Sequence, residues 1–177
     1  MSVIYLYSID DCVMHAGSGA CRVADICRLD VRGEEDTEYY KLIPLYEKGS
    51  VIYTPVDRAA GMMRKVHTDR EILALLAEIQ DVEALEPMDD RAREESYKTL
   101  LKENTCRAWL KVIRSAYAHN ARRAESSLKP TQMDERYMAI AENLLYGEVA
   151  ASLRIERENV KEYITEFVEG GQTAQAK

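Results

Sequence analysis

A glycine-containing stretch near the start of the chain, VMHAGSGACRVADI (residues 13–26), has residue types that could bind the phosphates of a nucleotide. A phosphate-binding loop of the G-x-G-x-x-G kind follows a strand and opens a helix, whose backbone amides face the pyrophosphate. Here Gly17 and Gly19 occupy the first two positions, but Arg22 occupies the third. The residues that follow, CRVADI, are typical of a strand. The pattern therefore predicts a turn between two strands, in which glycine supplies a positive φ.

Other residue types that do chemistry lie in no recognisable arrangement. The four cysteines form no C-x-x-C pair and have no histidine at ligand spacing, so we predict no metal and no cofactor and interpret them as small buried side chains. The three histidines are scattered and receive no predicted role. No G-x-S-x-G, G-K-[ST] or H-E-x-x-H motif is present. We therefore predict a protein that is not an enzyme, with no catalytic residues and no small-molecule substrate.

Composition points to a cytoplasmic globular protein. The chain has 177 residues, 46% of them hydrophobic and 31% charged, which is typical of a folded soluble protein. No apolar run approaches the ~20 residues that span a bilayer. The start, MSVIYLYSIDD, lacks the basic region and the cleavage site of a signal peptide. We therefore expect no membrane partner.

Charge is distributed unevenly along the chain. The net charge of −7 argues against a protein that binds nucleic acid over its whole surface. Residues 91–129, however, carry 10 basic and 4 acidic side chains, whereas residues 69–90 carry 1 basic and 8 acidic ones. A basic block beside an acidic one indicates a local surface that contacts phosphates.

The elements that must position these residues fall into two groups. Between Leu6 and Met63, four or five short β-branched or aromatic runs predict a small antiparallel barrel or a strongly bent sheet. From Thr68 onward the periodicity is helical, with Thr68 and Thr131 at the positions of helix caps. The predicted fold class is α+β, with a β domain over residues 1–66, an all-helical domain over 67–170 and a disordered tail over 171–177.

A predicted helix near residues 105–123 has a basic stripe. At 100° per residue, Arg107, Lys111, Arg114 and Arg122 share one face, and the opposite face is apolar. The apolar face comprises Cys106, Trp109, Leu110, Ile113, Ala116 and Tyr117, which places Trp109 in the core. The stripe is either a solvated face or a phosphate-binding surface, and the neighbouring cations favour the second interpretation. The candidate DNA-binding residues are Arg91, Arg93, Lys98, Arg107, Lys111, Arg114, Arg122, Arg123 and Arg136.

A second stretch, EVAASLRIERENVKEYI (residues 148–164), has the apolar spacing of a helix-turn-helix motif. Its second helix carries more acidic than basic side chains, and phosphates would repel it. We therefore predict a packing corner at this stretch and not a DNA reader.

The chain resembles the CarD-like family of transcriptional regulators. The stretches that carry the resemblance are YSIDDCVMHAGSGACRV, EYYKL and IYTPV in the β half, and REESYK, DERY and AENLLYGEVA in the helical half. They extend from about Leu6 to Phe167. The resemblance implies a Tudor-like β domain that docks on the β subunit of bacterial RNA polymerase. It also implies a helical domain that contacts promoter DNA and stabilises the open complex.

The chain departs from the family pattern at two places. Relatives often carry an exposed tryptophan near the start of the helical domain, which wedges into the minor groove. The corresponding stretch EPMDDRAREESY has none, which leaves Met88 and Tyr97 as weak substitutes. Tyr53 stands where some relatives have an arginine. The candidate polymerase-binding residues are Arg28, Arg32, Ile52, Tyr53 and Pro55.

The sequence therefore predicts a transcription regulator that docks on RNA polymerase and contacts promoter DNA weakly and with little sequence preference. The alternative is a protein-interaction module that binds polymerase or another partner without touching DNA.

Overall fold

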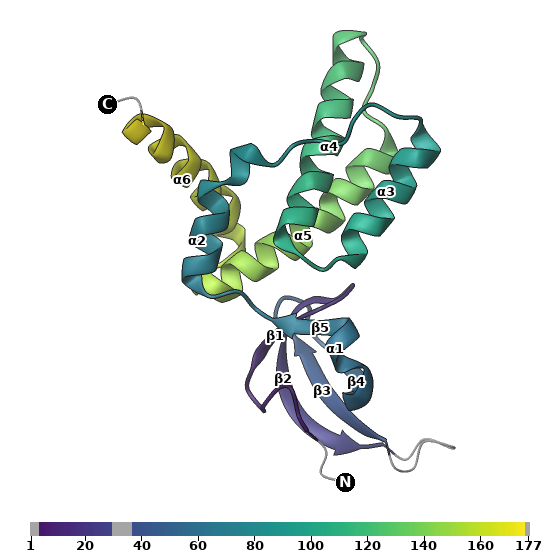
Figure 1. The fold of residues 1–177 in the computed structure, drawn as a ribbon, viewed down its shortest axis with the longest axis vertical. Coiled ribbons are helices and arrows are strands. Elements are labelled where there is room, and N and C mark those ends of the chain that lie inside the picture. Colours follow the sequence, from purple (N-terminus) through teal and green to yellow (C-terminus); the bar gives the residue numbers. More distant parts are fainter. Residues whose placement is uncertain (1–3, 30–36, 176–177) are drawn as a thin grey trace. The chain divides into compact units, whose positions relative to one another are not determined.

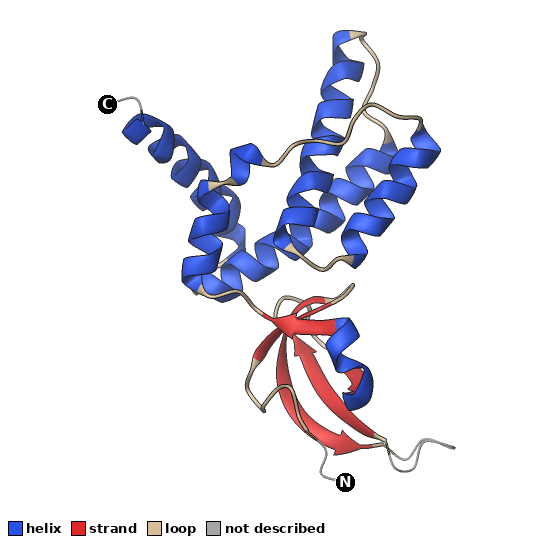
Figure 2. Cartoon of the chain, viewed as in Figure 1, coloured by secondary structure: helices blue, strands red, loops and turns tan. Residues whose placement is uncertain are grey.

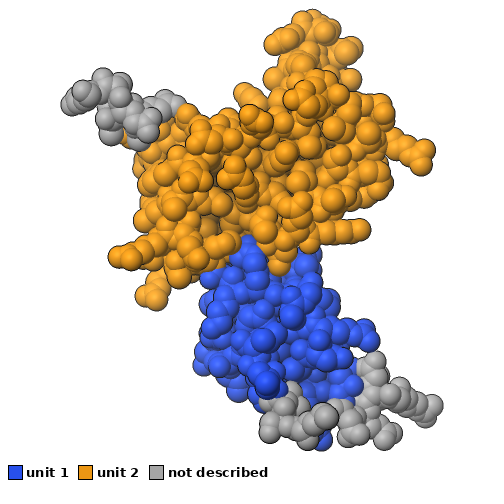
Figure 3. Space-filling model, viewed as in Figure 1, with its two compact units in different colours: residues 1–66 blue, residues 67–177 orange. Residues whose placement is uncertain are grey.

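The computed structural model describes residues 4–29 and 37–175. The chain divides into two compact units, residues 1–66 and residues 67–177, which Figure 3 distinguishes by colour. Unit 1 contains the strands, and unit 2 contains the long helices (Figure 2). The predicted α+β class, with a β domain first and helices after it, is confirmed.

Unit 1 is built on one antiparallel sheet with the strand order β4-β3-β2-β1-β5 (Figure 1). Its elements are β1 (Cys12–His15), β2 (Gly19–Arg28), β3 (Glu38–Pro44), β4 (Ile52–Pro55), the 3₁₀ turn η1 (Val56–Arg58), α1 (Ala59–Met62) and β5 (Met63–Lys65). Among the described residues β4 and β5 do not pair with each other, so the sheet is open. Of the two predicted forms, the bent sheet is therefore found and the closed barrel is not.

The glycine-containing stretch forms a hairpin, as predicted. β1 and β2 pair antiparallel, with His15 opposite Gly19 at the closed end. Gly17 and Gly19 have φ values of +86° and +76°, which residues with a Cβ atom rarely adopt. Because the strand β2 follows the glycines, this loop does not lead into a helix, as a pyrophosphate-binding loop does.

Two tyrosines connect the N-terminal segment to the core of unit 1. The Tyr40 hydroxyl accepts hydrogen bonds from the backbone N–H groups of Leu6 and Tyr7, at 2.9 and 3.2 Å. The Tyr7 hydroxyl donates to the carbonyl of Met63 at 2.8 Å. The two rings meet edge to face, with centroids 5.6 Å apart. Buried hydroxyls thus find partners while their rings fill the core.

Unit 2 consists of helices joined by short turns and one long connection. Its elements are α2 (Asp69–Ala77), η2 (Ile79–Asp81), α3 (Asp90–Lys102), α4 (Cys106–Glu125), α5 (Gln132–Leu153), η3 (Arg157–Asn159) and α6 (Val160–Gln175). The predicted caps are confirmed, since the side chains of Thr68 and Thr131 accept the backbone N–H groups of Glu71 and Asp134. The backbone of α6 continues to Gln175, beyond residue 170, where we expected the helical domain to end.

The core of unit 2 lies where α3, α4 and α5 pack side by side (Figure 1). Trp109 on α4 is fully buried, as predicted. Tyr117, which shares the apolar side of the helix in the predicted pattern, is 71% exposed. Tyr117 lies at the edge of the apolar arc of the helix, where a small rotation decides whether a side chain faces the core or solvent. Within the described residues, no helix is both long enough and apolar enough to cross a membrane.

The helix-turn-helix-like stretch forms the junction of α5 and α6. Arg154 ends α5 in the left-handed conformation, with φ of 57°, and the N–H of Ile155 bonds to the carbonyl of Ala150. Val160, the first residue of α6, is fully buried, whereas Leu153 is only partly buried. The burial of Val160 and the helix-ending hydrogen bond are the features of a packing corner.

Candidate polymerase and nucleic-acid interfaces

The strand β4 forms one edge of the sheet of unit 1 (Figure 1), and among the described residues it pairs only with β3. Its outer backbone groups can therefore pair with a strand of another protein. Thr54 is fully buried, Ile52 packs against the core, and Tyr53 is 41% exposed. Pro55, at the end of the strand, is half-buried and has no N–H to donate. Of the predicted polymerase contacts on β4, Tyr53 thus offers the most exposed side chain.

Apolar side chains surround this open edge. Four exposed ones lie on β4 and on the connection that leads into it from β3, namely Leu45, Tyr46, Val51 and Tyr53. Isolated exposed apolar side chains are ordinary, whereas a group of them beside an unpaired strand edge is typical of a protein-binding surface. We call these four residues the β4 patch.

The predicted arginine contacts of unit 1 lie apart from the β4 patch in the sequence. Arg28 is exposed at the end of β2, where its Nε atom lies 3.6 Å from Oε1 of Glu38. Glu38 is followed on β3 by Tyr39, which pairs with Pro55, so Arg28 lies at the same end of the sheet as Pro55. Arg32 lies outside the described residues.

The nine predicted DNA-binding residues of unit 2 differ widely in exposure. Arg91, Lys98, Arg107, Arg122 and Arg136 are exposed, Lys111, Arg114 and Arg123 are half-buried, and Arg93 is buried. These residues come from α3, α4 and α5. The charge pattern therefore indicates which part of the chain is basic, but burial decides which of its cations can reach a ligand.

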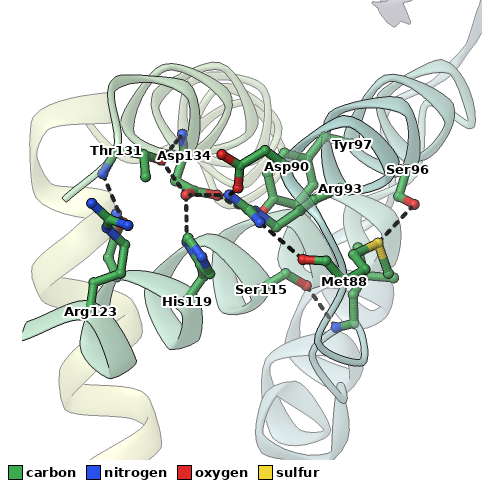
Figure 4. A network of polar contacts seen from close by, with 12 residues as sticks. Met88, Asp90, Arg93, Ser96, Tyr97, Ser115, His119, Arg123, Thr131 and Asp134 are labelled. Atoms are coloured by element: carbon green, nitrogen blue, oxygen red, sulfur yellow. Dashed lines mark hydrogen bonds and ion pairs between the residues drawn. The ribbon is translucent and has the colours of Figure 1, made fainter. Parts of the chain in front are cut away.

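Arg93 is a structural residue and is not placed to contact DNA. Its side chain is only 4% exposed. Nε and Nη2 donate to the two carboxylate oxygens of Asp134 at 3.0 and 3.2 Å (Figure 4). Nη2 also donates to Asp90 at 2.9 Å, and Nη1 lies 3.4 Å from the carbonyl of Met88. The prediction that Arg93 binds phosphates is corrected, because the fork of its guanidinium is already engaged inside the protein.

Asp134 is the centre of this network and joins three helices. It is fully buried, and Tyr97 and His119 bond to it at 2.9 and 2.8 Å (Figure 4). Thr131 caps α5 and donates its hydroxyl to the same carboxylate. Burial acts to raise the pKa of the Asp134 carboxyl, but hydrogen bonds, with Arg93 first, outweigh burial and hold the pKa below its ordinary value. Burial, followed by the bond to Asp134, raises the pKa of the Tyr97 hydroxyl.

Arg114 is also engaged within the protein. We call the connection between α2 and α3, residues 78–89, the strap, and it crosses α4 (Figure 1). Nη1 of Arg114 donates to the strap carbonyls of Ile79, Gln80 and Val82, at 3.1, 2.6 and 2.8 Å. The predicted basic stripe of α4 is therefore interrupted in its middle, where the strap covers it.

Several remaining cations have acidic neighbours at the surface. The Lys98 ammonium lies 2.9 Å from the carboxylate of Glu95 and 3.6 Å from that of Glu94. Arg136 lies 3.0 Å from Glu94, and Arg107 lies 3.7 Å from Glu78. Exposed ion pairs of this kind contribute only about 0–1 kcal/mol, so a phosphate can compete for the cation. Arg123 donates to the carbonyl of Lys129 at 2.8 Å. Within residues 4–29 and 37–175, Arg91, Lys111 and Arg122 form no ion pair.

Neither candidate for a minor-groove wedge projects freely into solvent. Tyr97 is fully buried and bonds to Asp134, so it is excluded as a wedge. Met88 on the strap is half-buried, and its sulfur lies 3.7 Å from the Ser96 hydroxyl (Figure 4). The exposed aromatic residue of α4 is Tyr117.

Residues without a predicted role come together elsewhere in unit 2. His67, Cys106 and Glu148 are far apart in the sequence, but their ligand atoms all lie within 4.8 Å of one another. Ligand spacing in the sequence does not indicate this group, because the contact joins distant segments. The cysteines also differ in burial: Cys21 and Cys106 are buried, as predicted, whereas Cys12 is exposed.

Unit 1 thus has an open sheet edge beside the β4 patch, and unit 2 has exposed cations on three helices. Comparison with known families agrees for unit 1, since residues 7–67 match the model described as the CarD-like/TRCF RID domain. The chain thus carries a domain of the CarD-like family, which is an RNA polymerase interaction domain and a non-enzymatic interaction module. The match covers nearly all of unit 1 and ends where unit 2 begins. No curated protein matches the chain.

Proposed function

We propose that the protein is a transcription regulator that docks on the β subunit of RNA polymerase through unit 1 and contacts promoter DNA through unit 2. The observation that carries the proposal is the match of residues 7–67 to an RNA polymerase interaction domain. The β4 edge supports this mode of docking, because an unpaired strand next to exposed apolar side chains can extend its sheet into a partner.

The docking surface is tested by a charge placed in the middle of the β4 patch. Tyr53→Glu leaves the fold intact, since the side chain is 41% exposed, but it puts a carboxylate where an apolar partner surface would lie. We expect the full-length variant to lose most of its binding to immobilised core polymerase and to the isolated β subunit. Tyr117→Glu is the matched control, because Tyr117 is also exposed but lies in unit 2. Equal binding by both variants would exclude the β4 edge as the docking surface.

DNA contact is assigned to cations that the fold leaves accessible. On α4, Lys111 and Arg122 are eleven residues apart and so differ by about 20° around the helix axis. They are about 17 Å apart along that axis, which equals the rise of about five base-pair steps of duplex DNA. Arg91 on α3 is exposed as well. Cations of this kind bind phosphates without reading bases, so the contact is weak and largely independent of sequence.

The DNA contact is tested with the double substitution Lys111→Glu and Arg122→Glu. Each lost phosphate contact lowers the slope of log affinity against log salt by about 0.9. We expect the variant to shorten the lifetime of the open promoter complex while its affinity for polymerase stays unchanged. The control is the double substitution Arg157→Glu and Lys161→Glu at the α5–α6 corner, which we expect to leave the lifetime unchanged.

The second candidate function is a protein-interaction module without DNA contact. The observation that favours it is the internal use of cations from the basic block, since Arg93 and Arg114 are engaged by protein groups. If the Lys111 and Arg122 variant supports a normal open-complex lifetime, this second function is the correct one.

A further inference from the structure

Three side chains of metal-ligating type converge in unit 2. His67 precedes the cap of α2, Cys106 is the first residue of α4, and Glu148 lies near the end of α5. The Nδ1 atom of His67 lies 2.7 Å from Oε1 of Glu148, and Sγ of Cys106 lies 3.0 Å from Oε2 of the same carboxylate. Sγ and Nδ1 are 4.0 Å apart. From this geometry we propose that His67, Cys106 and Glu148 form a binding site for a zinc ion.

The distances between the three ligand atoms suit a tetrahedral ion. Zinc lies about 2.0–2.3 Å from nitrogen, oxygen and sulfur ligands, which puts neighbouring ligands about 3.3–3.6 Å from one another. The contacts to Glu148 involve different oxygens, Oε1 for His67 at 2.7 Å and Oε2 for Cys106 at 3.0 Å, and Sγ and Nδ1 are 4.0 Å apart. With one oxygen of Glu148 as the ligand, the three ligand atoms lie within 4.8 Å of one another. Side-chain rotations that shift them by about 1 Å would bring them to coordination distance.

The chemical types of the donors select a transition metal. Magnesium and calcium prefer oxygen ligands, whereas one thiolate, one imidazole and one carboxylate form a mixed set of the kind that zinc accepts. Coordination releases the thiol proton of Cys106 to solvent, and it takes the neutral His67 tautomer whose proton is on Nε2, so that Nδ1 is free to bind the ion. The ion then replaces the two side-chain contacts to the Glu148 carboxylate with three metal–ligand bonds, one to each residue.

Burial and second contacts hold the ligands in place. The Glu148 carboxylate is fully buried and Cys106 is 1% exposed. The backbone N–H of His67 donates to Oε1 of Glu148 at 3.0 Å, which orients the carboxylate toward the other two ligands. A buried pair of thiolate and carboxylate is costly without a compensating cation, and a divalent ion supplies that charge.

Solvent reaches the site from the side of His67. Its side chain is 34% exposed and lines a cavity of about 300 Å³ together with Glu71, Glu78 and Arg107. A water molecule from this cavity can complete a four-coordinate zinc ion, as in sites with three protein ligands. The cavity also offers an entry path for the ion, which a buried site requires.

The ion would connect segments that the sequence separates by 39 and 42 residues. Because the site lies wholly within unit 2, the proposal does not depend on polymerase binding. A ligand that binds only the folded state raises the free energy of unfolding by RT ln(1 + c/Kd), where c is the free ligand concentration, so the stabilisation grows with that concentration. We therefore expect zinc to raise the midpoint of thermal unfolding of the full chain.

The experiment uses the full-length protein, zinc or cobalt alone, and two cysteine variants. The protein is loaded with zinc and passed through a desalting column, and its metal content is measured by plasma emission. We expect one zinc per chain in the wild type and in Cys12→Ser, and none in Cys106→Ser. With cobalt, the wild type and Cys12→Ser should show a thiolate-to-metal charge-transfer band that Cys106→Ser lacks. Cys12 is an exposed cysteine of unit 1 and serves as the matched control.

Circular dichroism of the metal-free proteins reports whether each variant is folded. If Cys106→Ser does not fold, His67→Ala replaces it, because His67 is partly exposed and its backbone bond to Glu148 survives the substitution. His67→Ala should fold and lose the zinc. The proposal is overturned if the wild type retains no zinc. It is equally overturned if a folded variant at Cys106 or His67 keeps the wild-type zinc content, or if bound cobalt shows no thiolate band.

Discussion

Arg91 and Arg93 are two residues apart on α3, yet the structure predicts opposite consequences for their replacement. Arg93 is 4% exposed and donates three hydrogen bonds to the carboxylates of Asp134 and Asp90. Arg93→Met keeps the apolar stem but leaves the buried Asp134 without its counter-charge. Removing one partner of a buried ion pair costs about 3–5 kcal/mol. That is a large part of the ~5–15 kcal/mol that stabilises a typical domain.

Arg91→Met is the matched control for this prediction. Arg91 is exposed and forms no ion pair within the described residues, so its replacement should change the free energy of unfolding by no more than about 0.5 kcal/mol. If Arg91 contacts a phosphate, the same substitution lowers the slope of log DNA affinity against log salt concentration by about 0.9. Arg93→Lys, which keeps the charge but loses the two-pronged geometry, should fall between the two variants in stability.

Unfolding in urea, followed by the fluorescence emission of Trp109, measures the free energy of unfolding of unit 2, which contains Arg91 and Arg93. Trp109 is the single tryptophan of the chain, and it is fully buried in α4, within unit 2. The reasoning is refuted if Arg93→Met lies within about 1 kcal/mol of the wild type, because a buried pair then contributes no more than an exposed one. It is also refuted if Arg93→Met remains as stable as Arg91→Met and loses DNA affinity to the same degree.

Three further predictions concern pH, the α5–α6 corner and the first hairpin. Because the pKa of Asp134 is lower in the folded state than in the unfolded state, its contribution to stability is complete above the ordinary pKa of about 4 and is lost as the pH falls through the folded value. Urea unfolding between about pH 6 and about pH 3, a range that includes the ordinary pKa, should therefore show a decline in stability that is steeper than that of Asp134→Asn; parallel curves would contradict it. Val160→Ala removes two fully buried methyl groups and should cost about 2 kcal/mol, whereas Leu153→Ala, partly buried, should cost about half as much in the same assay. Gly17→Ala meets no atom within 4 Å but must adopt φ of +86°, so a loss of about 1 kcal/mol is expected in thermal unfolding followed by circular dichroism; no loss would mean that the hairpin relaxes.

Local patterns in the sequence were sufficient for the order of the elements. The hairpin at Gly17 and Gly19 follows from glycine's freedom at positive φ and from the β-branched run after it. The helix starts at Thr68 and Thr131 follow from side chains that bond to backbone amides three residues later. Both signals are contained in a few neighbouring residues, so no knowledge of the rest of the chain is needed to read them.

The roles of individual charged residues required the tertiary structure. Arg91 and Arg93 have the same side chain in nearly the same sequence context, but only Arg93 meets Asp134, 41 residues away. Arg114 belongs to a regular basic stripe, yet the strap crosses that stripe and engages it. Helical periodicity specifies which side chains share a face, but it does not specify what packs on that face.

The sequence by itself determined the α+β class, the succession of strands and helices, and the position of a basic block in the helical half. Only the tertiary structure decided which residues of that block are accessible and brought His67, Cys106 and Glu148 together. The physical reason is the range of the interactions. Caps, turns and periodicity act over a few residues, whereas a buried ion pair or a metal site depends on side chains that meet only after distant segments have packed.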